Sequence, residues 1–520
     1  MSRLKKLTNS LLSGYVMLAS NMLYTLASVP LALHYLNKEE FGLWALVSQL
    51  GAYITLIDLG MSGSVARILI DHKDDRGNGA YGGVIKTGAL VGFVQGGLIV
   101  LAGIGLSVAA GSLLHVPAGM NANFTWLMIG QSLLMGVSFS TRIFGNLLLA
   151  HQRLDVTNYS SSVLFFVNLA AMWTGFAMGL GIYSFLIGQF VMIFGSVVVN
   201  ITGCTRLGFL PRGNEWGQVT YARFHEVFKF GNDIFIYTLG TQLISASQTI
   251  LLTRLLGLES AAVWNVCTRT YTMLTMIIFR FFDYSAPGLA EMMVRNEKEL
   301  LFKRFKQIVG FSLAVAVAAG GMFALCNSPF IAIWSSHKIS WSPINDLLLA
   351  AWLVVCVNMR LHTGLVGQTK KLRFMRYIFL IEGTVFIGLT ILFYKYGGIT
   401  AMLILSIICT SLFTMPYGLY RTAKYFSLNW QELAGWHKPA LLLACRLAPV
   451  GFPIWWMTHH FPAMWQLGIG GSVFGLWTAW TFLRYGIHHQ LQAELLGLAP
   501  AWAKTVLART VFEPKKAPHI

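Results

Sequence analysis

Apolar residues occur along the chain in long runs that are separated by short polar stretches. The runs are about twenty residues long, the length of helix that crosses the hydrocarbon core of a bilayer. Fourteen runs predict spanning helices: 11–33, 43–66, 84–111, 122–150, 158–180, 183–204, 229–256, 260–285, 307–333, 345–366, 377–394, 398–420, 439–459 and 463–484. The pattern therefore predicts an all-α membrane protein of about fourteen transmembrane helices.

The composition supports a chain that faces lipid. Of the 520 residues, 55% are hydrophobic and only 11% are charged, whereas a soluble domain carries roughly 25% charged residues. This leaves too little polar material to cover a surface in water. The first run, from Leu11 to Leu33, is too long for a secretory signal and lacks a clear cleavage site, so it reads as the first span.

The distribution of basic residues predicts the orientation. By these spans, 26 of the 38 Lys and Arg residues lie in segments on the side of the N-terminus, and three lie in loops on the other side. Because cytoplasmic loops are enriched in Lys and Arg, this predicts a multi-pass protein of the bacterial inner membrane with both termini in the cytoplasm. The same rule explains the net charge of +18 without nucleic acid as a partner.

A faint repeat divides the chain. Residues 36–44 resemble residues 256–264. The two copies are separated by six predicted spans, an even number, so they share an orientation and predict two parallel six-helix lobes around a central cavity. The domains expected are a first lobe, a cytoplasmic linker with an amphipathic segment, a second lobe, two additional helices and a cytoplasmic tail: 1–204, 205–228, 229–425, 439–484 and 485–520.

Buried charges are the strongest chemical signal. An arginine at the centre of a spanning helix costs about 2.5–3.5 kcal/mol on insertion scales, so it persists where it faces protein or water. Five arginines lie deep in the predicted spans and are the candidate substrate-binding residues: Arg142, Arg254, Arg269, Arg280 and Arg360. From the cytoplasmic side outward they form a ladder that suits a multiply charged anion, because a guanidinium binds phosphate oxygens bidentately and stays charged when buried.

Four carboxylates share the same regions and are candidates for ion coupling: Asp58, Asp233, Asp283 and Glu382. The alternative is structural pairing of these acids with the arginines, for example Asp283 with Arg280 one helical turn away. The six cysteines lie in or beside apolar runs without a CxxC motif, so neither disulfides nor a metal site is expected. No cofactor is predicted.

Several motifs together resemble a known family. Residues 35–46, YLNKEEFGLWAL, lead into 56–67, LIDLGMSGSVAR, and the second half carries FKFG at 228–231 and SAPGLAE at 285–291. In order and spacing these are similar to the Wzx-type polysaccharide flippases of the multidrug/oligosaccharidyl-lipid/polysaccharide (MOP) exporter superfamily, over residues 8–425. One departure is Asn37, which stands where the family usually has a turn glycine.

The resemblance implies two six-helix lobes that open alternately to either side of the membrane. It also implies a polyprenyl-diphosphate-linked oligosaccharide as cargo, and polysaccharide assembly proteins as further partners. The function expected is therefore a flippase rather than an enzyme. A drug or cation antiporter of the same superfamily is the nearest alternative, and its cavity would favour carboxylates. A membrane polymerase or glycosyltransferase is the alternative of another class, but it would need a larger outer loop or a soluble domain. A scaffold for a polysaccharide complex would not require deep arginines.

Overall fold

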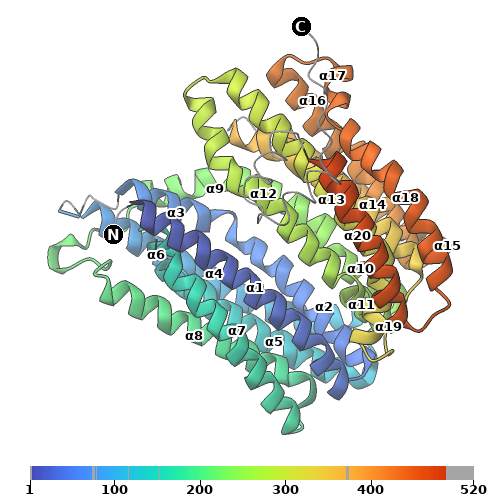
Figure 1. Cartoon of the computed structure of the whole chain (residues 1–520). Helices are drawn as coiled ribbons and strands as arrows, with labels where there is room; N and C mark the ends of the chain where they lie inside the picture. Colours follow the sequence, from blue (N-terminus) through green and yellow to red (C-terminus); the bar gives the residue numbers. More distant parts are fainter. Residues whose placement is uncertain are drawn as a thin grey trace. The chain divides into compact units, whose positions relative to one another are not determined.

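The computed structural model describes residues 3–72, 76–77, 79–114, 116–151, 153–369 and 374–487, and the described part is helical with no strand (Figure 1). The chain divides into two compact units, Met1–Asn265 and Val266–Ile520. The first unit extends past the predicted lobe limit at residue 204, because the following helices pack against earlier ones. The division into six-helix lobes stays a prediction.

The first unit is a bundle of helices of very different lengths. Its α-helices are α1 (Arg3–Tyr35), α2 (Lys38–Ile54), α3 (Met61–His72), α4 (Ala80–Leu113), α5 (Asn121–Thr141), α6 (Ile143–Ala150), α7 (Leu154–Ala177), α8 (Ser184–Arg206), α9 (Tyr221–Ser245), α10 (Ser247–Leu256) and α11 (Leu258–Cys267), the last of which crosses the unit boundary. Helix α1 packs on α7, α7 on α8, α4 on α5, and α2 on both α5 and α10.

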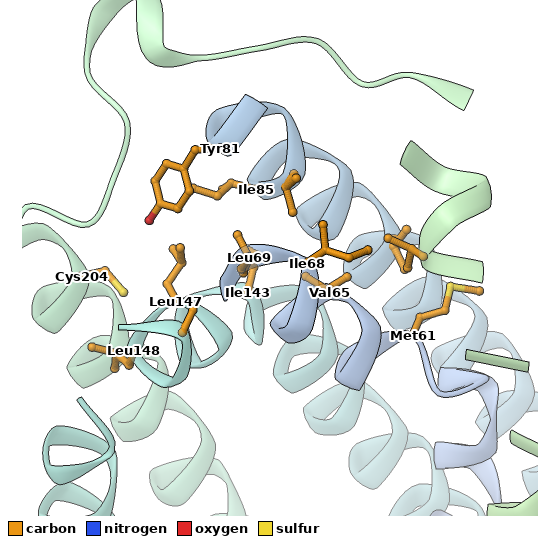
Figure 2. Packing of buried hydrophobic residues seen from close by; sticks show 14 residues of the cluster. Met61, Val65, Ile68, Leu69, Tyr81, Ile85, Ile143, Leu147, Leu148 and Cys204 are labelled. Carbon is orange, nitrogen blue, oxygen red and sulfur yellow. The ribbon is translucent and has the colours of Figure 1, made fainter. Parts of the chain in front are cut away.

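A buried apolar cluster at one end of this unit is centred on α3 (Figure 2). Met61, Val65, Ile68 and Leu69 are spaced so that they share one helical face. Helix α3 packs on α4, α6 and α9. Tyr81 of α4 is fully buried in the same cluster. The cluster therefore holds the second half of a broken span against three other helices.

The second unit is also helical. Its α-helices are α12 (Arg269–Val294), α13 (Lys298–Trp334), α14 (Pro343–Gln368), α15 (Met375–Leu412), α16 (Thr414–Phe426), α17 (Trp430–Gly435), α18 (Lys438–Thr458), α19 (Ala463–Trp465) and α20 (Ser472–Thr481). Helix α13 is central, because it packs on α12, α14, α18 and α20. The basic stretch at 298–306 forms the beginning of α13 and is continuous with the span that follows it.

Nine helical segments in the described residues are long and apolar enough to cross a membrane, or ten if the pair α5 and α6 forms one span bent by 42°. The longest, Met375–Phe426, covers two of the predicted spans and turns at Gly398, whose φ of 52° leaves the helical range. The all-α membrane architecture is therefore confirmed, whereas the number of fourteen spans stays a prediction.

Five predicted spans are broken rather than continuous. One of them, 398–420, breaks at Phe413 between α15 and α16. The span predicted at 43–66 is split by a 3₁₀ turn, η1 (Thr55–Asp58), and the span at 122–150 bends at Arg142. The spans at 229–256 and 260–285 break at Ala246 and Thr268. Periodicity does not reveal such breaks, because the apolar residues on both sides keep the same composition. Where a break frees backbone groups, lipid cannot satisfy them, so other protein groups must.

The two repeat copies turn in different ways, which explains the missing glycine. Gly257 has a φ of 87°, a conformation that favours glycine. Asn37 instead has an extended backbone, and its side chain accepts a hydrogen bond from the Glu40 amide while the Glu40 carboxylate accepts one from the Asn37 amide. This capping box begins α2 without a left-handed residue.

Candidate functional site

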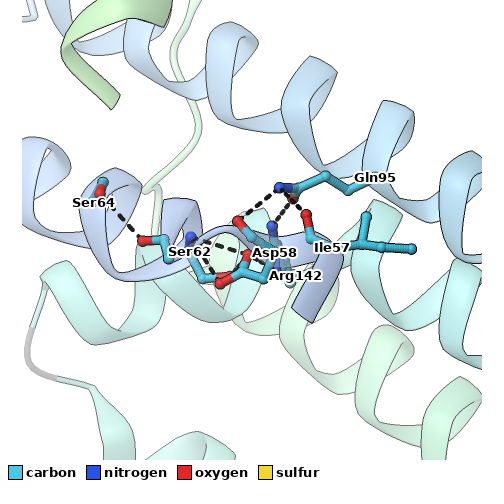
Figure 3. A network of polar contacts seen from close by, with 7 residues as sticks. Ile57, Asp58, Ser62, Ser64, Gln95 and Arg142 are labelled. Atoms are coloured by element: carbon cyan, nitrogen blue, oxygen red, sulfur yellow. Dashed lines mark hydrogen bonds and ion pairs between the residues drawn. The ribbon is translucent and has the colours of Figure 1, made fainter. Parts of the chain in front are cut away.

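The break in the second predicted span carries a carboxylate that meets an arginine of the fourth (Figure 3). The Asp58 Oδ1 atom lies 2.6 Å from Nη1 of Arg142. Their side chains are only 23% and 19% exposed, so the pair is shielded from solvent and each charge compensates the other. The Arg142 guanidinium also lies over the ring of Phe139, 4.5 Å from its centre.

Gln95 of α4 completes this network. Its amide Nε2 donates to the backbone oxygens of Ile57 at 3.1 Å and Asp58 at 2.9 Å, and its Oε1 accepts from Nη2 of Arg142. Gln95 is 3% exposed. One buried side chain therefore satisfies carbonyls freed by the 3₁₀ turn and also holds the arginine that pairs with the turn.

The same carboxylate stabilises the start of α3. Asp58 Oδ1 accepts hydrogen bonds from the amide of Ser62 at 3.2 Å and from its hydroxyl at 2.7 Å. Between them, Leu59 and Gly60 have φ values of 50° and 71°, and the left-handed region costs a residue with a β-carbon about 1–2 kcal/mol. Asp58 thus offsets local strain by capping the helix that follows it.

A second acid–arginine pair lies in the second unit. Nη2 of Arg360, in α14, donates to Oδ1 of Asp283, in α12, at 2.8 Å. The two side chains are 33% and 38% exposed, so water screens this pair more than the first. Sequence reasoning had offered Arg280 as the local structural partner of Asp283, but the recorded partner of the carboxylate comes from a different helix.

The two pairs lie on corresponding spans of the predicted repeat. Asp58 and Arg142 lie on the second and fourth predicted spans, and Asp283 and Arg360 lie on the eighth and tenth, six spans later. The structure thus brings together two candidate carboxylates with two candidate arginines. Each pair joins non-adjacent spans, which is the kind of contact that must change if the helices move past each other.

The other three candidate arginines lie on α10 and α12. Arg254 is exposed in the last turn of α10. Arg269 is the first residue of α12 and is partly buried, immediately after the break at Thr268. Arg280 is partly buried in the middle of the same helix.

Of the two remaining candidate acids, Glu382 has a described side chain and Asp233 does not. Glu382 of α15 is 1% exposed, and its carboxylate accepts from the Thr410 hydroxyl at 2.8 Å and from the Thr414 amide at 3.2 Å. Because Thr414 begins α16, Glu382 satisfies a backbone donor at the break between α15 and α16. Asp233 falls within α9, but its side chain lies outside the described residues.

Sequence reasoning missed a buried carboxylate, Asp346 in the first turn of α14. It is fully buried and accepts hydrogen bonds from Asn327 Nδ2 at 2.7 Å, from Trp341 Nε1 at 3.0 Å and from the hydroxyl of Ser328. An acid inside a predicted span was the signal that could have found it. Its position near the end of the span made it look like an ordinary polar boundary.

The Asp346 network reaches the break that precedes Arg269. Asn327 Nδ2 also donates to the Cys267 carbonyl at 3.2 Å, and Asn327 Oδ1 accepts from the hydroxyl of Thr270. Cys267 ends α11 and Arg269 begins α12. Asn327, which also bonds to Asp346, therefore bonds to residues on both sides of Arg269.

The two repeat copies also touch each other within the first unit. Lys38 Nζ donates to Glu259 Oε1 at 2.7 Å, and a β-carbon added to Gly42 would lie 2.0 Å from the Leu258 oxygen. Further along α2, the Tyr53 hydroxyl donates to the Gln242 carbonyl at 3.2 Å. Together these contacts form a seam between α2 and the segment from α9 to α11.

Solved structures of membrane transporters share this fold. Lipid II flippase MurJ in an inward closed conformation matches with a TM-score of 0.63 and 12% identity over 92% of this chain and 99% of that one. An inward-facing multidrug resistance MATE family transporter of the MOP superfamily matches with a TM-score of 0.59 and 12% identity over 77% and 94%. A MOP superfamily transporter from Pyrococcus furiosus gives 0.54 and 13% over 81% and 96%.

The chain therefore has the fold of these multi-span membrane proteins. A family model described as polysaccharide biosynthesis protein matches residues 7–293, more than half of the chain. The chain belongs to this family. A comparison with curated proteins found no match.

Proposed function

We propose that this protein translocates a polyprenyl-diphosphate-linked oligosaccharide across the bacterial inner membrane for polysaccharide assembly. One observation carries the proposal: a member of the polysaccharide biosynthesis family has the fold of a lipid II flippase over 92% of its length. The diphosphate would enter among the deep arginines while the polyprenyl chain stays in lipid. The arginines act by electrostatics and by bidentate hydrogen bonds, with no covalent step.

The two acid–arginine pairs supply a way to couple binding to movement. A phosphate oxygen and a carboxylate compete for the same guanidinium donors. When the diphosphate approaches Arg142 or Arg360, the arginine can exchange Asp58 or Asp283 for the substrate. That exchange would release two spans from each other, and a ligand shifts a conformational equilibrium only through such a difference between states.

A carboxylate released in this way could bind a coupling ion. Asp58, Asp233, Asp283 and Glu382 are the proposed coupling residues, and Glu382, like Asp58, caps a helix break. Each would be replaced by its amide and tested for transport with and without an ion gradient. Normal, equally gradient-dependent transport by all four variants would exclude this role.

The flippase proposal is tested by loss and by reconstitution. Cells without the protein should accumulate the lipid-linked oligosaccharide in the cytoplasmic leaflet and lose surface polysaccharide. Purified protein in vesicles should then move the labelled substrate between leaflets. If the purified protein moves cationic drugs in exchange for ions but leaves the oligosaccharide where it was, the antiporter alternative holds. Chemical conversion of the oligosaccharide would instead indicate an enzyme.

The proposed topology places both termini in the cytoplasm. Reporter fusions after Lys306 and after Arg376 should then report the cytoplasm, and a fusion after Ser340 should report the periplasm. A periplasmic signal at Lys306 would contradict the orientation and the even number of spans before it.

A further inference from the structure

Two oxygen atoms from different elements of the first unit face the same cationic group. Oδ1 of Asp58, in η1, lies 2.6 Å from Nη1 of Arg142, and Oε1 of Gln95, in α4, accepts a hydrogen bond from Nη2 of the same arginine (Figure 3). Nη1 and Nη2 belong to one planar guanidinium group. The two oxygens therefore converge on a single positive charge.

The two oxygens are also held by groups other than the arginine. Nε2 of Gln95 donates to the carbonyl oxygens of Ile57 and Asp58, at 3.1 and 2.9 Å, and the Gln95 side chain is buried. The Asp58 carboxylate accepts from the amide and the hydroxyl of Ser62. Each oxygen therefore has a support that remains when the guanidinium moves away.

Departure of the arginine would leave a charge that needs compensation. Removal of one partner from a shielded ion pair leaves an uncompensated charge, which is strongly unfavourable. The charge lost from beside Asp58 is a single positive one, so a monovalent cation restores the balance and a divalent cation exceeds it. Because the Asp58 side chain is partly exposed, a small ion can reach the carboxylate from water.

The groups around Asp58 are those that hard cations prefer. Carboxylate, amide and backbone carbonyl oxygens bind such ions, and the carbonyls of unwound spanning helices coordinate Na⁺ in membrane transporters. The carbonyls of Ile57 and Asp58 lie beside Gln95, and each keeps a second lone pair. We propose that Asp58, Gln95 and these two carbonyls form a site for a monovalent alkali cation, which takes the place of the Arg142 guanidinium. Water fills the remaining coordination positions.

The role of this site in transport rests on the proposed function, in which a phosphate of the substrate binds Arg142. The cation then compensates Asp58 while the phosphate compensates Arg142, so the opened ion pair leaves neither charge alone. Both ligands bind the state in which the pair is open, and each therefore raises the affinity for the other by the same factor. The site itself needs no substrate once the arginine is removed by substitution.

The test measures binding of radiolabelled Na⁺ to the purified full-length protein without oligosaccharide. Arg142→Gln should bind the ion about tenfold more tightly than the wild type, because the attached guanidinium competes in the wild type. Unlabelled NaCl or KCl should displace the label, and choline chloride at the same ionic strength should not. Asp58→Asn/Arg142→Gln should lose the binding. Gln95→Met/Arg142→Gln should weaken it, whereas Gln95→Glu/Arg142→Gln, which keeps an oxygen and adds charge, should bind at least as tightly as Arg142→Gln.

Arg153→Gln is the matched control, because Arg153 pairs with Asp155 in the first turn of α7 and the two side chains are similarly shielded, 25% and 18% exposed. It should bind no more Na⁺ than the wild type. Thermal unfolding checks that each variant is folded, and NaCl should raise the unfolding temperature of Arg142→Gln more than that of Asp58→Asn/Arg142→Gln. The proposal is overturned if folded Arg142→Gln binds no Na⁺, if choline displaces the label equally, or if Asp58→Asn/Arg142→Gln binds as well. Stabilisation of Arg142→Gln by acid in place of Na⁺ would also overturn it, because the carboxylate would then take a proton.

A second measurement separates the cation site from the flippase proposal. Farnesyl diphosphate, a short soluble polyprenyl diphosphate, should increase Na⁺ binding by the wild type, because its phosphates draw Arg142 away from Asp58. If Arg142→Gln binds Na⁺ and the wild type does not respond to farnesyl diphosphate, the cation site is supported and the exchange of Arg142 between carboxylate and diphosphate is wrong.

Discussion

The carboxylate of Asp58 lies 2.6 Å from the guanidinium of Arg142, and each residue stands at the break of a different predicted span. A break in a spanning helix leaves backbone groups without partners. Here the two breaks support each other, since Gln95 bonds to the backbone of one and to the arginine of the other. The pair is therefore part of the helix architecture in this conformation as well as a candidate for substrate exchange.

Neutralising one member of this pair should destabilise the protein. Asp58→Asn leaves Arg142 partly buried without its carboxylate, and we expect a loss of about 1–3 kcal/mol, less than for a fully buried pair. Thermal unfolding of the purified protein measures it. In the double variant Asp58→Asn/Arg142→Gln, part of the loss should be recovered, because no unpaired charge remains.

The second pair provides the comparison. Asp283 and Arg360 are more exposed, so Asp283→Asn should cost at most about 1 kcal/mol. If the effects of Asp58→Asn and Arg142→Gln simply add, the ion pair contributes no coupling energy. A larger stability loss at Asp283 than at Asp58 would contradict the role of burial.

Replacement of Arg269 should reduce transport more than stability. Arg269→Ala removes a charge at the start of α12, where Asn265, Thr268 and Thr272 make the neighbouring face polar. We expect at least a tenfold loss of surface polysaccharide at equal protein level, since a charge-assisted hydrogen bond to phosphate contributes about 1.5–3 kcal/mol. Arg269→Lys keeps the charge but removes the guanidinium. Normal surface polysaccharide in this variant would indicate that only the charge is needed, and its loss would indicate a bidentate contact with phosphate.

Lys303→Ala is the control for Arg269, because Lys303 is an exposed cation of α13. It should export normally. Well-inserted Arg269→Ala and Arg269→Lys variants with normal export would remove Arg269 from the mechanism.

Asp346 should be important for folding. Asp346→Asn keeps the size of the side chain but replaces one acceptor oxygen by an NH₂ group. This group would face the donors of Asn327, Ser328 and Trp341, so at least one hydrogen bond would be lost. Hydrogen bonds to a charged group contribute about 1.5–3 kcal/mol each, so we expect the free energy of unfolding to fall by at least about 2 kcal/mol.

Glu299→Gln is the matched control for Asp346, because Glu299 is exposed. It should leave the unfolding temperature unchanged. A fully stable Asp346→Asn variant that still exports polysaccharide would show that the network does not position the break before Arg269.

A methyl group at Gly42 should open the seam between the repeat copies. The added β-carbon would lie 2.0 Å from the Leu258 oxygen, so α2 and the start of α11 would have to separate. The readout is disulfide formation in the variant Lys38→Cys/Glu259→Cys, which replaces the ion pair. Addition of Gly42→Ala should lower the yield several-fold.

Gly63→Ala is the control for this experiment, because nothing lies within 4 Å of its added β-carbon. It should leave the disulfide yield unchanged. An unchanged yield with Gly42→Ala would show that the seam tolerates the methyl group and that close approach at Gly42 is not required.

The sequence by itself determined the membrane architecture and the family. A span forms a helix because lipid offers the backbone no hydrogen-bond partner, and it needs about twenty apolar residues to cross the bilayer. Such runs can therefore be recognised in the sequence alone. The motif at 35–46 and the one at 56–67 begin segments that the structure also forms, α2 and the break before α3. Even the missing turn glycine was visible, although its reason, the capping box of Asn37 and Glu40, required coordinates.

Only the tertiary structure decided which charges meet. Asp283 had a basic neighbour one turn away in Arg280, yet the arginine recorded on its carboxylate is Arg360 of another helix. From the sequence, Asp346 resembled a polar helix end, but in the structure Asn327 and Trp341 donate hydrogen bonds to its carboxylate. The physical reason is that an ion pair between spans depends on helix rotation and on the breaks within helices. Both are set by packing against several neighbours at once, and the apolar pattern of a single run records neither.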